Sequence, residues 1–425
     1  MQRHLVLLLV AIVVASLNMR LGIAAPGPVI ESIRLDTAMS SGVAGLLVTI
    51  PFVCMSLFSF TGPPALRRLS PYAVILIALI LIAGGTLARA VAPDAALVLL
   101  ATIPIGAGIA VMGVALPVLV KIHFARWSGA VTSAYITGMS VGVLVFTAIL
   151  VPLAELLGSW REAFAVSALP ALLGIAMWIW VHRPGVMPAG TNREPVSDPV
   201  ATANRFVKPQ REELMSAASF GLQSMTYSAL AAWIAVIYTE QGWSAGTAAL
   251  LIGLGGLMTI PGAFIAAGVS RGKDRRPFIA GSVVVFCLAL FGIALAPDVT
   301  PWAAWAYVTV WGLFAGGAFA LQLAMPIDVR RTALGVARLT AWMLGLGYLL
   351  SAATPIMIGV LRDATGGFEL PMTLLAVFAS IGVVVAFLLP APLPKDPGYE
   401  TEPLPSDPVD PVRPSVLPPI PRTAE

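Results

Sequence analysis

Apolar residues gather in twelve long runs, which polar or charged breaks separate along nearly the whole chain. Each run holds about 20 residues, the length that a helix needs to cross roughly 30 Å of hydrocarbon. The runs cover residues 5–29, 42–61, 72–91, 95–120, 129–154, 162–182, 214–239, 245–269, 277–296, 302–325, 339–361 and 370–390. The pattern predicts an all-α membrane protein with twelve transmembrane helices.

The composition agrees with a chain that lies in a bilayer. Apolar residues make up 58% of it and charged residues only 11%, against about 25% charged residues in a soluble domain. The net charge of +4 therefore gives no indication of nucleic-acid binding. Cys54 and Cys287 both lie inside predicted helices, so no disulfide framework is implied.

Breaks that are rich in Lys and Arg alternate along the chain with breaks that hold few, and this alternation predicts the orientation of the chain. With the N-terminus in the cytoplasm, seventeen basic residues fall in the cytoplasmic breaks and before the first helix, and four fall in the outer breaks. The outer four are Arg34, Arg89, Arg161 and Arg362. Because cytoplasmic loops carry an excess of Lys and Arg, we expect a multi-pass protein of the inner (plasma) membrane with both termini cytoplasmic.

Two polar segments divide the chain. Residues 183–212 separate an N-terminal six-helix bundle, 1–182, from a C-terminal six-helix bundle, 213–390, and are predicted to be a cytoplasmic linker. Residues 391–425 contain eleven prolines and no apolar periodicity. Such a composition is typical of a disordered tail. We expect the tail to be cytoplasmic, and we expect both segments to be dispensable for the activity of the two bundles.

The two halves repeat weakly. "SSGVAGLL" at 40–47 matches "SAGTAALL" at 244–251, and "SAYITG" at 133–138 matches "TAWMLG" at 340–345. "GSWRE" at 158–162 is echoed by "GGFE" at 366–369, again at nearly the same offset. The matches predict duplicated, pseudo-symmetric bundles, whose substrate site would lie near the midplane between the repeats.

That offset brings polar positions of the two halves into correspondence. "SLNMRLG" at 16–22 holds Asn18 and Arg20 inside the first apolar run, opposite "GLQSMTY" at 221–227 in the seventh. Gln223 and Tyr227 are four residues apart and so share a helix face. Tyr135 of the fifth run corresponds to Trp342 of the eleventh. We predict a cavity lined by these side chains. We leave open whether Tyr348 packs in the core, faces lipid or stacks on a substrate.

Arg20 is the most informative of these residues, because an arginine at the helix centre costs about 2.5–3.5 kcal/mol on insertion scales. No carboxylate occurs in the middle of any predicted span. One interpretation is that Arg20 extends toward the outer surface or pairs with Glu155. The other is that it faces a water-filled cavity and binds a small anion or strongly dipolar solute, for which its planar fork is suited.

Several short motifs carry a resemblance to a known family. "SLNMR", "LPVLVK" at 116–121, "FGLQSMTYSALAAWIAVIY" in the seventh run, "GGAFAL" at 316–321, and "GLGYLLSA" followed by "GVLRDATGG" are similar to the cyanate/2-nitroimidazole transporter family of the major facilitator superfamily. The resemblance implies twelve helices that alternate between inward- and outward-facing states around a small substrate. It also implies that Gln322 in the tenth helix lines the cavity. Leu21 and Leu344 depart from the family's usual Pro and Gln.

The superfamily's cytoplasmic loops imply gating residues. "GPPALRRLSP" keeps Arg67 and Arg68 but lacks the usual aspartate, whereas "SRGKDRRP" has Asp274 followed by Arg275 and Arg276. We expect the second loop to contribute more to gating. An equally open interpretation is that both loops are only positively charged anchors.

The remaining predictions concern alternatives and partners. A proton-coupled efflux pump for neutral or cationic drugs would need an acid within the bundle, and none is visible. All three histidines lie at cytoplasmic edges, apart from any acid pair, so we expect no enzyme, metal or cofactor. We expect a monomer whose partners are a small-molecule substrate and the lipid bilayer, with protons open as the coupling ion. Gly138 and Gly142 are predicted to be close-packing positions.

Overall fold

The fold is taken from a computed structural model, which describes residues 3–24, 26–39, 41–183, 208–271, 273–297, 300 and 302–393. The described residues up to Pro392 belong to one compact unit. Most of the predicted linker and nearly all of the predicted tail lie outside the described residues, so both remain predictions.

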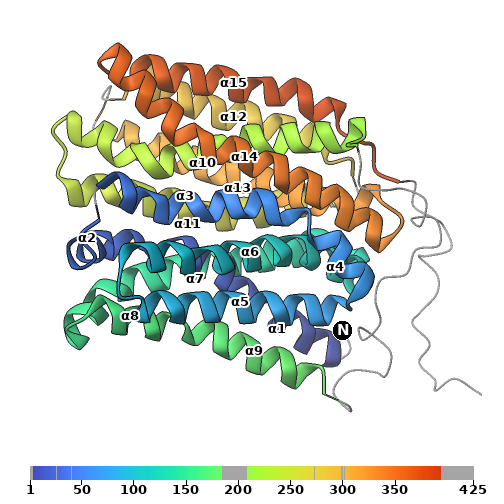
Figure 1. Cartoon of the computed structure of the whole chain (residues 1–425). Coiled ribbons are helices and arrows are strands. Elements are labelled where there is room, and N and C mark those ends of the chain that lie inside the picture. The colour runs from blue at the N-terminus through green and yellow to red at the C-terminus, as the bar shows by residue number, and fades with distance from the viewer. Residues whose placement is uncertain are drawn as a thin grey trace, which may run out of the picture. The chain divides into compact units, whose positions relative to one another are not determined.

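The described residues form helices and no strands (Figure 1). The first half contains α1 (Arg3–Ala24), α2 (Pro26–Asp36), α3 (Ser41–Ser59), α4 (Gly62–Arg68), α5 (Pro71–Val91), α6 (Ala95–Phe124), the short η1 (Ala125–Trp127), α7 (Ser128–Leu157), α8 (Trp160–Ser167) and α9 (Leu169–Val181). The second half contains α10 (Arg211–Glu240), α11 (Ala245–Val269), α12 (Arg276–Leu295), α13 (Ala303–Val329), α14 (Ala333–Thr365) and α15 (Glu369–Leu388).

These helices confirm the prediction of twelve spans. Ten helical stretches of the described chain are long and apolar enough to cross a membrane, and a pair bent by 51°, Thr49–Ser59 with Gly62–Arg68, adds an eleventh. One of the ten, Ala95–Val145, is 51 residues long and contains α6, η1 and the first part of α7. Counted separately, α6 and α7 bring the total to twelve.

Local signals set several helix ends. The side chains of Ser70, Asp94 and Thr332 cap α5, α6 and α14 by accepting a backbone N–H of the first turn, which is the preferred chemistry of a helix start. Gly158 and Gly366 end α7 and α14 with φ of 76° and 77°, a conformation that glycine adopts without strain. These two glycines open the repeated segments "GSWRE" and "GGFE", so this repeat marks equivalent helix ends.

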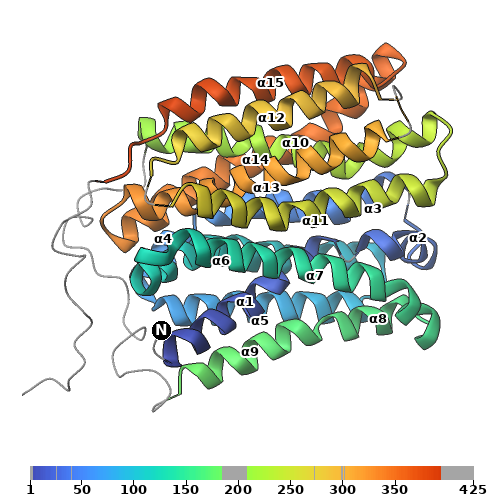
Figure 2. The same ribbon diagram turned by 180° about the vertical axis from the view of Figure 1, so that it is seen from behind.

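Packing follows the same scheme in both halves, which confirms two pseudo-symmetric bundles. In the first half α1 contacts α7 and α9, α3 contacts α6, and α5 contacts α6 and α9. In the second half the equivalent pairs are α10 with α14 and α15, α11 with α13, and α12 with α13 and α15. Figures 1 and 2 show from opposite sides that α8 and α9 lie at one edge of the bundle and α12 and α15 at the other.

The halves meet through two equivalent crossings. α7 of the first half packs on α11 of the second, and α14 packs on α3. We call the end of the bundle where α1 begins the N-face, and the opposite end the far face. The N-face also carries α4 and the end of α6 (Figure 1). The basic residues of α4, of the α11–α12 loop and of the α13–α14 loop gather at this N-face.

Candidate functional site

A cavity of about 80 Å³ lies between the two halves. Helices α1, α3 and α7 of the first half and α10, α11, α13 and α14 of the second supply its wall. Its lining residues are Met19, Arg20, Phe52, Met55, Ile136, Met139, Val143, Gln223, Ser224, Tyr227, Thr259, Ala315, Gly316, Phe319 and Tyr348. The wall is therefore mostly apolar and aromatic, with a few polar groups, which is the usual make-up of a small-molecule site.

Close packing between α1 and α7 positions Arg20. A side chain at Gly138 would clash with Ser16, and one at Gly142 would clash with the carbonyl group of Leu17. Both glycines are thus close-packing positions, as predicted. Leu17 lies almost one turn before Arg20 on α1, so the contact with Gly142 fixes the height and rotation at which Arg20 enters the cavity.

Arg20 contacts aromatic rings of the other half. Its guanidinium carbon lies 4.8 Å from the ring centroid of Tyr227 and 5.1 Å from that of Phe319. These distances are within the range of cation–π attraction. Among the side chains that the structure describes, no carboxylate lies within 4.0 Å of Arg20. The ion pairs of the described residues do not join Arg20 to Glu155, which is exposed in the last turn of α7.

Gln223 contributes a hydrogen-bond acceptor to the same cavity. Its side chain is 4% exposed, and its Nε2 donates to the carbonyl oxygen of Ala315 at 3.3 Å. Its Oε1 is buried and has no hydrogen-bond partner within the protein. A buried acceptor of this kind costs free energy unless a donor reaches it, so the cavity presents an open place for an N–H or O–H group.

Tyr227 is held by a tryptophan behind it. The rings of Tyr227 and Trp311 are stacked with centroids 6.1 Å apart and planes 24° apart. Trp311 is in turn fixed, because its Nε1 donates to Thr226 Oγ1 at 3.2 Å. The ring that faces Arg20 is therefore supported by α13 as well as by its own helix, α10.

Asn18 does not lie beside Arg20, contrary to the prediction. It is 1% exposed, and its Nδ2 donates to Pro170 O at the start of α9, at 3.3 Å. Residues two apart on a helix point in nearly opposite directions, because 3.6 residues make a turn. Asn18 thus faces the interior of the first half, where it anchors α1 to α9.

Three further predicted residues do not line this cavity. Tyr135 borders a neighbouring space of about 20 Å³ nearer the N-face. Gln322 donates from Nε2 to Ser219 within the second half, with its Oε1 left buried and unpartnered. Trp342 packs edge-on against Phe60, with centroids 4.8 Å apart. The two departures from the family, Leu21 and Leu344, likewise border smaller spaces rather than the main cavity.

The cavity is also lined by three aromatic side chains, Phe52, Phe319 and Tyr348. The sequence does not assign Phe52 or Phe319 to the site, and it leaves the role of Tyr348 open. The aromatic side chains of Phe52 and Tyr348 meet across the halves, with ring centroids 6.1 Å apart. The sequence of an apolar helix does not indicate the direction in which an aromatic side chain points. For Phe52 and Tyr348, the packing of α3 on α14 determines that direction.

The N-face is closed by polar contacts between the halves. Lys121 Nζ, at the end of α6, donates to the carbonyl oxygen of Ile327 in α13 at 2.8 Å. Ser128, at the start of α7, donates to Asp328 at 3.3 Å and accepts from Arg275 at 3.2 Å. Arg275 also forms an ion pair with Asp328 at 2.7 Å.

Of the predicted gating residues, Arg275 takes part in these contacts between the halves. Asp274 instead pairs with Arg276 at 2.6 Å inside the same loop. The hydrogen bond from Arg276 lowers the pKa of Asp274. Arg67 and Arg68 lie on the exposed face of α4. Sequence reasoning missed Asp328, because one acid in the last turn of an apolar helix does not show what it meets.

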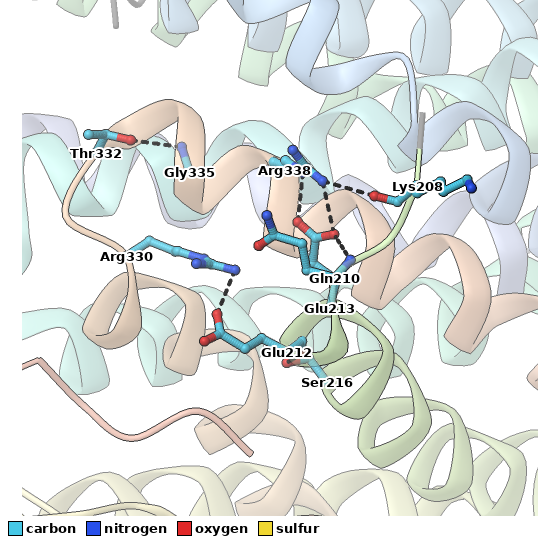
Figure 3. A network of polar contacts seen from close by, with 9 residues as sticks. All are labelled: Lys208, Gln210, Glu212, Glu213, Ser216, Arg330, Thr332, Gly335 and Arg338. Atoms are coloured by element: carbon cyan, nitrogen blue, oxygen red, sulfur yellow. Dashed lines mark hydrogen bonds and ion pairs between the residues drawn. The ribbon is translucent and has the colours of Figure 1, made fainter. Parts of the chain in front are cut away.

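A second polar network at the N-face lies wholly within the second half (Figure 3). Glu213 is 1% exposed and pairs with Arg338 of α14 at 2.7 Å. The backbone N–H of Gln210 also donates to Glu213, at 2.8 Å. Glu212 pairs with Arg330 at 2.8 Å. The network therefore fastens the start of α10 to α14 and the loop before it, without joining the halves.

Comparisons with known proteins agree with this architecture. A family model described as the Major Facilitator Superfamily matches residues 8–348. The uncharacterized transporter YycB of Bacillus subtilis (strain 168) is 30% identical over 378 residues, which cover 87% of this chain and 89% of that protein.

Two relatives come from Escherichia coli (strain K12). The cyanate transport protein CynX is 28% identical over 386 residues, or 91% of this chain and 97% of that protein. The 2-nitroimidazole transporter is 26% identical over 382 residues, or 89% and 93%. Among solved structures, the proton:xylose symporter XylE bound to 6-bromo-6-deoxy-D-glucose has a TM-score of 0.75 at 13% identity and covers 91% of this chain and 96% of its own. This chain is a multi-pass membrane transporter that belongs to the major facilitator superfamily, within its cyanate and 2-nitroimidazole transporter family.

Proposed function

We propose that this transporter moves a small anionic or strongly polar solute by alternating access, with Arg20 as the principal anion-binding group. Cyanate-like, nitroimidazole-like and small organic anions are the candidate classes, in line with the names of two relatives. The observation that carries the proposal is the position of Arg20. It enters a cavity between the halves with no carboxylate among the described side chains within 4.0 Å.

The way in which Arg20 is held supports an anionic or dipolar ligand. Tyr227 and Phe319 meet the guanidinium over their ring faces. The five N–H donors of an arginine lie in the plane of its fork, so stacking on rings leaves donors for a planar acceptor such as a carboxylate or a nitro group. The rings thus stabilise part of the positive charge of Arg20, and a bound anionic solute would neutralise it.

Gln223 and the size of the cavity narrow the solute further. Gln223 Oε1 is a buried acceptor without a partner, so a solute with an N–H or O–H donor gains a hydrogen bond there. One water molecule needs about 10–15 Å³ of cavity volume. A cavity of about 80 Å³ therefore holds roughly five to eight waters, or a solute with a comparable number of non-hydrogen atoms.

The contacts at the N-face support a proposal for gating. Lys121, Ser128, Arg275 and Asp328 hold that face shut in the structure described. We propose that they separate when the N-face opens. Because basic residues gather there, we assign the N-face to the cytoplasm. The loop of Arg275 thus contributes to gating, although Asp274 and Arg276 pair with each other.

Ligand affinity of purified protein tests the role of Arg20. Cyanate, 2-nitroimidazole and small carboxylates form the panel, and calorimetry with counterflow in liposomes gives the readouts. Arg20→Ala should abolish anion binding, and Arg20→Lys should weaken it because the fork is lost. Arg126→Ala, at an exposed arginine of the N-face, is the matched control. Equal affinity in folded Arg20→Ala protein would refute the proposal.

A proton-coupled efflux pump for neutral or cationic drugs is the alternative. The apolar wall formed by Phe52, Met55, Met139 and Tyr348 favours it. The lining residues include no acid, and Arg20 would repel a cation. Under this alternative, the Arg20→Ala protein should bind cationic drugs more tightly than the wild type. Calorimetry with such drugs added to the panel distinguishes the efflux function from the transport of a small anion.

A further inference from the structure

Arg89 is a second arginine inside the bundle, away from the transport cavity. The sequence places it among the basic residues of the outer breaks, but its side chain turns inward from the last turns of α5 and Arg89 is 1% exposed. Its Nη2 donates to Thr102 Oγ1 at 3.1 Å, and its Nη1 lies 3.5 Å from Gly22 O, near the end of α1. The ring centroid of Phe164 is 5.6 Å from its guanidinium carbon.

These neighbours do not neutralise the charge. No carboxylate among the described side chains lies within 4.0 Å of Arg89, and its Nε is buried without a hydrogen-bond partner. Both acceptors that it has, a hydroxyl and a carbonyl, are neutral groups. A buried ion without a counter-ion carries a desolvation penalty of several kcal/mol, so the site calls for a negative charge.

A small cavity adjoins this guanidinium. It measures about 10 Å³, and its lining residues are Asn18, Leu21, Gly22, Ile82, Thr86, Arg89, Phe164, Ser167 and Ala171. A space of that size holds one water-sized particle. Ser167 and Ala171 come from α8 and α9, which continue into each other as one helical span, Trp160–Val181. The positive charge beside this space for one particle therefore comes from Arg89.

We propose that this cavity binds a single monatomic anion, chloride, as the counter-ion of Arg89. A halide is close to water in size, whereas nitrate or sulfate would not fit. The site is separate from the proposed solute site, because Asn18 and Arg20 point from opposite faces of α1. Through Arg89, Asn18 and Ala171 the anion would connect α5, α1 and α9 inside the first half.

Thermal unfolding of the purified protein tests this site at constant ionic strength, with chloride replacing gluconate. The wild type should show a saturable rise in Tm, of about 1–3 °C at tenfold excess over the dissociation constant. Arg89→Gln should lose this rise, whereas Arg20→Gln should keep it. The absence of a saturable rise in the wild type, an equal rise in Arg89→Gln, or a loss confined to Arg20→Gln would overturn the proposal.

Diffraction from wild-type crystals grown in bromide gives a test that needs no variant. Bromide has an anomalous signal and binds where chloride does. An anomalous peak within hydrogen-bonding distance of Arg89 Nε, beside Ala171, is the expected result. Density there without an anomalous signal would show that water fills the cavity and would overturn the proposal. A bromide peak found only beside Arg20 would overturn it as well.

Discussion

Replacing Lys121 by methionine removes a charge that joins the two halves at the N-face while keeping a side chain of similar length. Lys121 Nζ donates to Ile327 O at 2.8 Å. This carbonyl lies in the last turn of α13, where the partial negative charge of the helix end attracts a cation. Asp328 lies near enough to add to the attraction.

The expected magnitude follows from these contacts. A hydrogen bond to a charged group contributes about 1.5–3 kcal/mol, and a cation at a partly buried helix end up to about 2 kcal/mol. Lys121 is half-buried, so solvent screens part of both. We therefore expect a loss of about 1–2 kcal/mol from the closed N-face, which corresponds to a roughly 5–30-fold shift toward the open N-face.

Electron–electron double resonance measures this shift. Spin labels at Arg126→Cys and Arg331→Cys report the distance between the halves, since both positions are exposed at the N-face. Cys54→Ala and Cys287→Ala remove the buried native thiols from the background. Lys121→Met should add a longer-distance population that the parent protein shows only weakly.

A matched substitution guards against a general effect of lost charge. Lys273 is exposed at the same face in the α11–α12 loop, and its ammonium lies 5.8 Å from the ring of Phe278 in its own half. Lys273→Met should leave the distance distribution unchanged. An unchanged distribution in Lys121→Met, or an equal change in Lys273→Met, would refute the assignment of Lys121 to the closure.

Three further predictions concern packing and binding. Gly142→Ala should lower both Tm and solute affinity, because the added methyl group overpacks α1 at a cost of about 1–3 kcal/mol. Gly84→Ala is the control and should change neither, because a methyl group there meets open space. Gln223→Leu should lower the affinity for solutes that carry an N–H donor by about 3–10-fold, because one hydrogen bond contributes about 0.5–1.5 kcal/mol. Calorimetry with such a solute, compared with a solute that lacks a donor, checks this. Glu213→Gln should lower Tm without changing affinity, because its ion pair is buried within one half; Glu212→Gln, at a side chain 49% exposed, should have little effect on Tm.

The spans could be predicted from sequence because their signal is local. An apolar run of about 20 residues satisfies its backbone internally as a helix, whatever it packs against. Arg20, Gln223 and Tyr227 could be placed at one cavity for a related reason. A polar break in an apolar helix is costly unless it meets water or a ligand, and the repeat aligned two such breaks.

The direction of a side chain around its helix was harder to predict. Asn18 shares the polar break with Arg20, yet helical geometry turns it toward α9. Gln322 was assigned to the cavity by resemblance, although a buried amide is equally satisfied by Ser219 on a neighbouring helix. Arg89 was counted as a loop residue, because a charge two residues before the end of an apolar run gives no sign that it folds inward.

The attachment of α1 bears on how solute binding and closure are connected. α1 is fastened to its own half by Gly142 of α7 and by the bond from Asn18 to α9. Arg20 must therefore move with the first half, whereas Tyr227 and Phe319 move with the second. A solute held by Arg20 and by Gln223 of α10 would bridge the two halves. A ligand shifts a conformational equilibrium only through its differential affinity for the two states. Under the proposed function, such a bridge would supply that difference, because it forms only when the two halves are close together around Arg20.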